Sequence, residues 1–137
     1  MPVVDASVVV DWVAPDVDLA APAVRLLGMI ARAEAPLVAP PLLLVEVGEA
    51  LARGVRLRRW SAPEADASYA LLARLPVRLV DDPRDVHRAW ELASRFEGQA
   101  LRALTYVALA ERLGERLVTA DRELRRHVRR LGLLRVP

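Results

Sequence analysis

The chain has 137 residues, of which 54% are hydrophobic and 28% charged, a composition typical of a globular domain and not of a disordered segment. It contains no cysteine, which excludes disulfides, zinc–thiolate sites and cysteine nucleophiles. The formal net charge is +2 and all 20 basic residues are arginine, so chemistry that needs a lysine is excluded, while guanidinium groups suited to bidentate phosphate contacts are plentiful.

Short apolar runs alternate with segments of helical periodicity along the chain. Ser61 and Glu64 form a capping box at the start of one helix. Asp82 with Pro83 opens another helix, and Gly114 ends the last long one. In chain order we predict a strand at 3–4, helices at 6–13 and 19–33, a strand at 37–39, helices at 42–55 and 61–73, a strand at 77–80, a helix from 82, a helix at 100–113, a strand at 116–119, a short arginine-rich helix after 121 and a small strand at 133–136.

The predicted strands are short, apolar throughout and separated by helices. Such strands are typical of a parallel sheet that is covered on both faces. We therefore expect a single three-layer α/β/α domain over residues 1–137, with a mainly parallel sheet. No apolar run reaches the roughly 18 residues that span a membrane, and no signal peptide is visible, so we expect a cytoplasmic protein.

Three carboxylates stand within or directly after apolar runs, namely Asp5, Glu46 and Asp121. An ionised carboxylate beside packed aliphatic side chains is costly unless it is paired or binds a metal. Ligands of open parallel sheets bind beyond the carboxyl ends of the strands, so we expect these three residues to converge on one crevice. With no cysteine and two histidines far apart, a metal there would be bound through oxygen, which suits Mg²⁺ or Mn²⁺.

Each carboxylate also has a simpler interpretation. Asp5 can cap the helix that follows it, and Asp121 can be a turn residue or the N-cap before Arg122. Glu46 can be a solvated residue at the edge of its helix. The acidic cluster at 81–85 is expected to provide caps and solvated charge.

The motifs around these residues resemble those of PIN-domain ribonucleases. The segment 2–8, Pro-Val-Val-Asp-Ala-Ser-Val, is similar to the opening motif of the family, and the segment 46–51, Glu-Val-Gly-Glu-Ala-Leu, to the second motif. Residues 106–114 and 117–121 are similar to the third and fourth motifs. The order and spacing of the motifs over nearly the whole chain suit the small VapC-type toxins of bacterial and archaeal toxin–antitoxin systems.

This resemblance implies a PIN-like fold and cleavage of RNA in an acidic pocket that holds Mg²⁺ or Mn²⁺. Asp5, Glu46 and Asp121 would be the catalytic metal ligands. Ser7 and Thr119 would support them by orienting a carboxylate or a water. The resemblance further implies a homodimer and a cognate antitoxin protein whose tail enters the pocket.

One position departs from the family pattern. Ala103 stands where the family usually has an aspartate, and Arg102 places a positive charge beside it. We therefore predict a metal-dependent endoribonuclease of weakened activity. The alternative is a catalytically degenerate PIN-like domain that binds RNA or a protein partner without cleavage. Glu97 and Gln99 just upstream, and Glu49, where the family often has asparagine, are the groups available to replace part of the lost polarity.

Two groups of arginines suit an RNA partner. One lies at 53–59. The other, in the last predicted helix, includes Arg122, Arg125 and Arg126. Arginine contacts to phosphate give affinity and salt dependence more than sequence selectivity.

Two other classes of protein also have an acidic pocket at the ends of parallel strands. These are the receiver domains and the haloacid-dehalogenase-like phosphatases. Both need a lysine near the phosphate, and this chain has none, so neither class is a serious alternative.

Overall fold

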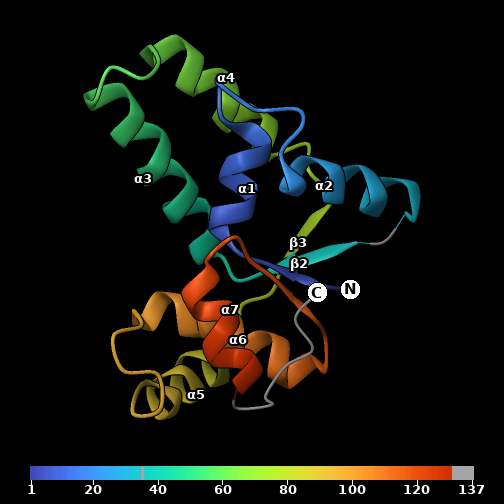
Figure 1. Ribbon diagram of the computed structural model, residues 1–137, viewed down its shortest axis with the longest axis vertical. Coiled ribbons are helices and arrows are strands. Elements are labelled where there is room, and N and C mark those ends of the chain that lie inside the picture. Colours follow the sequence, from blue (N-terminus) through green and yellow to red (C-terminus); the bar gives the residue numbers. More distant parts are fainter. Residues whose placement is uncertain (35, 131–137) are drawn as a thin grey trace.

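The computed structural model describes residues 1–34 and 36–130 (Figure 1). The predicted small strand at 133–136 lies outside these residues. The elements in chain order are β1 (Val3–Val4), α1 (Ala6–Val13), α2 (Pro22–Arg32), β2 (Leu37–Ala39), α3 (Leu42–Arg56), α4 (Ala62–Leu72), β3 (Val77–Leu79), α5 (Pro83–Ala93), α6 (Leu101–Leu113), β4 (Leu117–Val118) and α7 (Arg122–Arg130).

The strands form one parallel sheet in the order β3-β2-β1-β4. β1 lies in the middle, where Val3 is in register with Val38 of β2 and with Leu117 of β4. Helices α1 to α4 lie on one side of the sheet and α5 to α7 on the other (Figure 1). The predicted three-layer α/β/α fold is therefore confirmed.

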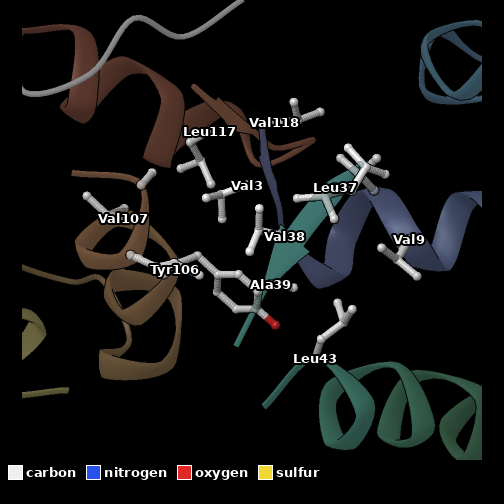
Figure 2. Close-up of a cluster of buried hydrophobic side chains, with 14 of the residues drawn as sticks. Val3, Val9, Leu37, Val38, Ala39, Leu43, Tyr106, Val107, Leu117 and Val118 are labelled. Atoms are coloured by element: carbon white, nitrogen blue, oxygen red, sulfur yellow. The ribbon is translucent and has the colours of Figure 1, made fainter. Parts of the chain in front are cut away.

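The core forms around the strands because their side chains are apolar on both faces of the sheet. The side chains of β1 and β2 are fully buried. Figure 2 shows side chains from β1, β2 and β4 gathered between Tyr106 and Val107 of α6 and Val9 of α1. The strand ends that carry the candidate acids are consequently held between two helical layers.

Local signals fix most helix ends as predicted. Ser61 and Glu64 form the expected capping box at the start of α4, with hydrogen bonds of 3.2 and 3.0 Å. Gly114 ends α6 in the left-handed conformation, with φ of 64°, which glycine adopts without strain. The predicted helix at 19–33 begins only at Pro22, because Asp18 accepts hydrogen bonds in a turn and Ala21 precedes a proline.

The expectation of solvated charge at 81–85 is wrong for Asp85. Asp82 caps α5 as expected, but the Asp85 side chain is buried and only 3% exposed. It accepts hydrogen bonds of 2.7 and 2.9 Å from the guanidinium of Arg112 on α6. Helices α5 and α6 are further joined by a 2.7 Å bond between Arg88 and Glu111. These pairs fix α6, which carries part of the site described below.

None of the helices in the described part of the chain has both the length and the apolar character that crossing a membrane requires.

Candidate active site

An open cavity of about 350 Å³ lies beyond the carboxyl ends of β1 and β4. Asp5, Glu46 and Asp121 all line it, although they come from three separate parts of the chain. The remaining wall residues are Ala6, Ser7, Gly98, Gln99, Ala100, Arg102, Ala103, Tyr106, Glu123 and Leu124. Four carboxylates and one guanidinium therefore share this cavity, and its wall is acidic.

Asp5 directly follows β1 and caps α1, so its capping and its place in the cavity are not alternatives. Its Oδ1 accepts hydrogen bonds from Ser7 Oγ at 2.6 Å and from the Val8 amide at 3.4 Å. Its Oδ2 accepts a short hydrogen bond from Thr119 Oγ1. The residue is only 7% exposed. Both carboxylate oxygens are thus oriented by the protein.

Burial raises the pKa of Asp5 above its ordinary value, because desolvation disfavours the charged form. The hydrogen bonds from Ser7, Thr119 and Val8 oppose this increase, and the negative charge of Asp121 adds to it. An ionised Asp5 is therefore held in a place that favours neutralisation by a proton or by a cation.

Two hydroxyl groups connect the start of α1 with the segment after β4. Ser7 Oγ donates to Asp5 and accepts a 3.0 Å hydrogen bond from the Ala120 amide. Thr119 Oγ1 donates to Asp5 and accepts a 3.0 Å hydrogen bond from the Asp121 amide. Thr119 consequently links the side chain of one candidate acid to the backbone of another.

Glu46 lies in the second turn of α3 and faces the cavity, with only 16% of its side chain exposed. Its Oε1 accepts a 2.7 Å hydrogen bond from the Tyr106 hydroxyl, and its Oε2 lies 3.3 Å from Arg102 Nε. Burial raises the pKa of Glu46, against the opposing effects of Tyr106 and Arg102. Burial and the bond to Glu46 also raise the pKa of Tyr106, which remains a hydrogen-bond donor. Glu46 is therefore not simply a solvated residue at the helix edge.

Asp121 is exposed and precedes α7. Its Oδ1 accepts hydrogen bonds of 3.0 Å from the Glu123 and Leu124 amides, which is the geometry of a helix cap. Its Oδ2 accepts no hydrogen bond from the described residues. One oxygen of Asp121 thus caps the helix while the other is open to a ligand.

The position of the missing acid lies in the same wall. Ala103 lines the cavity, and the neighbouring Arg102, which is 65% exposed at its side chain, pairs with Glu46. Gln99 also lines the cavity, whereas Glu97 and Glu49 do not. The additional carboxylate in the wall is Glu123. It is neither Glu97 nor Glu49, the two carboxylates that we expected as substitutes.

Sequence reasoning missed two polar side chains of the wall. Glu123 contributes a fourth carboxylate from the first turn of α7. Tyr106 donates the hydrogen bond that holds Glu46. Both could have been found, because Glu123 lies two residues after Asp121 and Tyr106 begins the third motif.

The carboxylates of the acidic cavity are of the type that a hard cation binds, but they are few in number. All the ligating groups are oxygens, as Mg²⁺ and Mn²⁺ prefer. Among the residues that the structure describes, no three histidine, aspartate or glutamate side chains lie close enough to hold one ion together. Mg²⁺ needs only one or two carboxylates when water and phosphate complete its shell. The cavity therefore suits one weakly held ion better than two.

The arginines of α7 are not equivalent. Arg125 is partly buried, and its Nη2 donates to the carbonyl of Thr119. Arg122 and Arg126 are exposed and make no ion pair within the described part of the chain. Arg125 is thus a wall residue behind the site, while the other two remain open to an anionic partner.

The arrangement of acids at the ends of adjacent parallel strands agrees with the comparison to known families. The model of the PIN domain family matches residues 3–129. A search of curated proteins finds no match. PIN domains are generally nucleases, and their fold is the three-layer α/β/α arrangement seen here. The chain therefore belongs to the PIN domain family.

Proposed function

We infer that the protein is a metal-dependent endoribonuclease of the VapC type, with activity weakened by the alanine at position 103. The observation that carries this proposal is the presence of Asp5, Glu46 and Asp121 in one open acidic cavity at the strand ends. Glu46 adds to this support, since only 16% of its side chain is exposed and the hydroxyl of Tyr106 holds it in the cavity wall.

In this proposal one Mg²⁺ or Mn²⁺ ion would bind among Asp5, Glu46 and Asp121, held directly by one or two of these carboxylates while water and the RNA phosphate complete its shell. When bound, such an ion lowers the pKa of a coordinated water and stabilises charge on the phosphate during hydrolysis. Ser7 and Thr119 fix both oxygens of Asp5, and Tyr106 fixes Glu46. Hydrogen bonds of this kind from neighbouring groups orient a metal-binding carboxylate before the ion binds.

Arg102 has two opposing effects on this chemistry. Its guanidinium lies 3.3 Å from Glu46 and so competes with a cation for that carboxylate. The same guanidinium is mostly exposed on the cavity wall, and such a group can contact a phosphate. We expect the first effect to dominate metal binding and the second to contribute to RNA binding.

The substrate is recognised mainly through its backbone. Arg122 and Arg126 are exposed on the helix that follows Asp121, where they can contact phosphates on either side of the cleaved bond. Arg125 contributes by shaping the wall behind the site. The chain has only three tryptophans, two tyrosines and one phenylalanine, so stacking on bases is limited.

Calorimetry with Mn²⁺ and a cleavage assay on structured RNA, both on the purified protein, test this proposal. Metal binding and cleavage should both be abolished by Asp5→Asn. Arg95→Ala is the matched control, because Arg95 is exposed, lies outside the cavity and makes no ion pair in the described part of the chain. Cleavage that persists in EDTA or in Asp5→Asn would reject the proposed mechanism.

A second candidate is a PIN-like domain that binds RNA or a protein without cleaving RNA. The ion pair between Arg102 and Glu46 favours it, because a guanidinium there replaces part of the charge that a cation would supply. In that case a folded protein binds RNA equally well with and without EDTA, and no Mn²⁺ binding is detected. Cleavage that requires metal would reject this candidate.

The VapC-type assignment also proposes a homodimer and a cognate antitoxin in the cytoplasm. The antitoxin would place a basic tail, with an arginine, in the acidic cavity. A dimer in light scattering at micromolar concentration supports the first part, and a monomer contradicts it. Growth arrest on expression, relieved by a small protein encoded beside this chain, would support the second.

A further inference from the structure

A second cavity, of about 370 Å³, lies next to the acidic one and is here called the side cavity. Its wall includes Val8, Asp11, Leu26, Thr119, Arg122 and Arg125. Helix α1 and the segment 118–125 contribute different residues to the walls of both cavities. Thr119 lines the side cavity and connects it to the acidic one, because its hydroxyl donates to Asp5 while its carbonyl accepts from Arg125.

The wall of the side cavity combines apolar and charged groups. Val8, Pro22 and Leu26 supply apolar surface from α1 and α2. Arg122 and Arg125 bring two guanidiniums, and Asp11 brings one carboxylate. A flat ring with hydrogen-bonding edges and an attached anion is complementary to such a wall, since its faces need apolar contact and its edges need both donors and acceptors.

The charged groups of this wall do not satisfy one another. Asp11 and Arg122 form no ion pair in the described part of the chain. Arg125 makes one hydrogen bond, to Thr119, and its buried Nε has no acceptor among the described residues. A buried donor without an acceptor is unfavourable, and such groups are rare in folded proteins unless a ligand or water completes them. Partial desolvation raises the pKa of Asp11, although the residue is exposed.

We propose that the side cavity binds one nucleotide of the RNA strand, next to the nucleotide whose bond is cleaved. The base lies against the apolar wall with its edge toward Asp11 and Arg125, and its phosphate contacts Arg122. This inference rests on the proposed ribonuclease function, because only then does the neighbouring acidic cavity hold the next phosphate of the same strand. Sequence preference at one flanking position follows from it, which contacts to phosphates alone do not provide.

The test measures binding of the four ribonucleoside 5′-monophosphates and of inorganic phosphate by calorimetry, in EDTA. Arg122→Ala removes the phosphate contact, and Ala21→Phe fills the cavity from its partly buried rim. Arg95→Ala is the control for the loss of one exposed guanidinium. Thermal unfolding of each variant establishes that it is folded. We expect each of the two test variants to bind nucleotides at least about tenfold more weakly, a change of about 1.4 kcal/mol, and the control to match the parent protein.

Three results would overturn the inference: no nucleotide binding by the parent protein at millimolar concentration, unchanged binding by both test variants, or inorganic phosphate binding as tightly as the nucleotides. Other results distinguish a failure of this inference from a failure of the proposed function. Metal-dependent cleavage that is unaffected by Arg122→Ala and Ala21→Phe leaves the nuclease standing and rejects the side cavity as a subsite. Nucleotide binding that depends on Arg122, without any cleavage, supports the side cavity and rejects the nuclease.

Discussion

The hydroxyl of Thr119 donates a hydrogen bond to the buried carboxylate of Asp5, across 114 positions of the sequence. The same hydroxyl accepts from the amide of Asp121. Thr119 thus sets the relative positions of two candidate metal ligands that come from adjacent strands. A hydroxyl that both donates and accepts is required for this, because the carboxylate is an acceptor and the amide a donor.

Replacing Thr119 by valine keeps the shape of the side chain but removes both hydrogen bonds. We expect the free energy of unfolding to fall by about 1–3 kcal/mol, since one oxygen of a buried carboxylate loses its partner. Chemical denaturation measures this change, and calorimetry with Mn²⁺ should show weaker binding. Thr119→Ser keeps the hydroxyl and is the control. Equal stability of the valine variant and the parent protein would contradict the role given to this residue.

Asp5→Asn should stabilise the fold at neutral pH while it removes metal binding. Burial raises the pKa of Asp5 in the folded protein, so ionisation of Asp5 opposes folding as the pH rises through that raised pKa. The variant therefore has the higher melting temperature at about pH 8, and its advantage disappears toward about pH 4, where the carboxyl is protonated in the parent protein. Melting curves across this range in EDTA measure the difference. A lower melting temperature at every pH would mean that the hydrogen bonds from Ser7 and Thr119 outweigh the desolvation.

Arg102→Ala should increase the affinity for Mn²⁺, because it frees Glu46 from a competing positive charge. The pair is largely exposed on the arginine side, so the gain is modest, about fivefold or roughly 1 kcal/mol. RNA binding in EDTA should weaken in the same variant. Arg102→Gln, which keeps polarity without charge, should behave like the alanine variant. Unchanged metal affinity in both would show that the guanidinium does not compete for Glu46.

Ala103→Asp should restore the carboxylate that the family usually has at this position of the cavity wall. We expect Mn²⁺ affinity and RNA cleavage to rise by at least about tenfold, since affinity for hard cations depends on the number of charged oxygen ligands. Calorimetry and the cleavage assay measure the two effects. Ala103→Asn is the control without added charge. If neither quantity rises, position 103 is not the missing ligand and the alignment with the family motif is wrong.

Asp85→Asn should destabilise the fold, although Asp85 does not line the acidic cavity. Asp85 is buried and paired with Arg112 through two hydrogen bonds, so its neutralisation leaves the guanidinium with a 3.7 Å contact to Asp82 as its remaining carboxylate partner among the described residues. The free energy of unfolding should fall by about 3 kcal/mol. Asp81→Asn, at an exposed position two residues before the start of α5 at Pro83, should change the free energy of unfolding by less than about 0.5 kcal/mol. A fall of similar size in both variants would contradict the special status of the buried pair.

Local patterns in the sequence account for most of the fold. Apolar runs predicted all four strands of the described sheet, and caps such as Ser61 and Gly114 predicted where helices begin and end. The exception at 19–21 arose because helical spacing of apolar residues continued upstream of Pro22, where a turn held by Asp18 takes over. The burial of Asp85 was missed because its partner, Arg112, lies on a different helix.

The candidate site was only partly accessible from the sequence. The rule that ligands bind at the ends of parallel strands correctly indicated that Asp5, Glu46 and Asp121 share one cavity. The contacts of Tyr106 with Glu46 and of Arg125 with Thr119 depend on how helices pack across the sheet, which no local pattern specifies. The side cavity was not predicted for the same reason, since α1, α2 and β4 meet there only in the folded chain.

The pairing of β1 with β4 also determines when the site can exist. A chain emerging from the ribosome presents Asp5 and Glu46 early, but it lacks the wall formed by Thr119 and Asp121 until β4 has been made and has docked beside β1. Domains fold as units during synthesis, and contacts between distant segments form late. A nascent chain therefore lacks the complete cavity, and any activity of this site can arise only after β4 has docked beside β1.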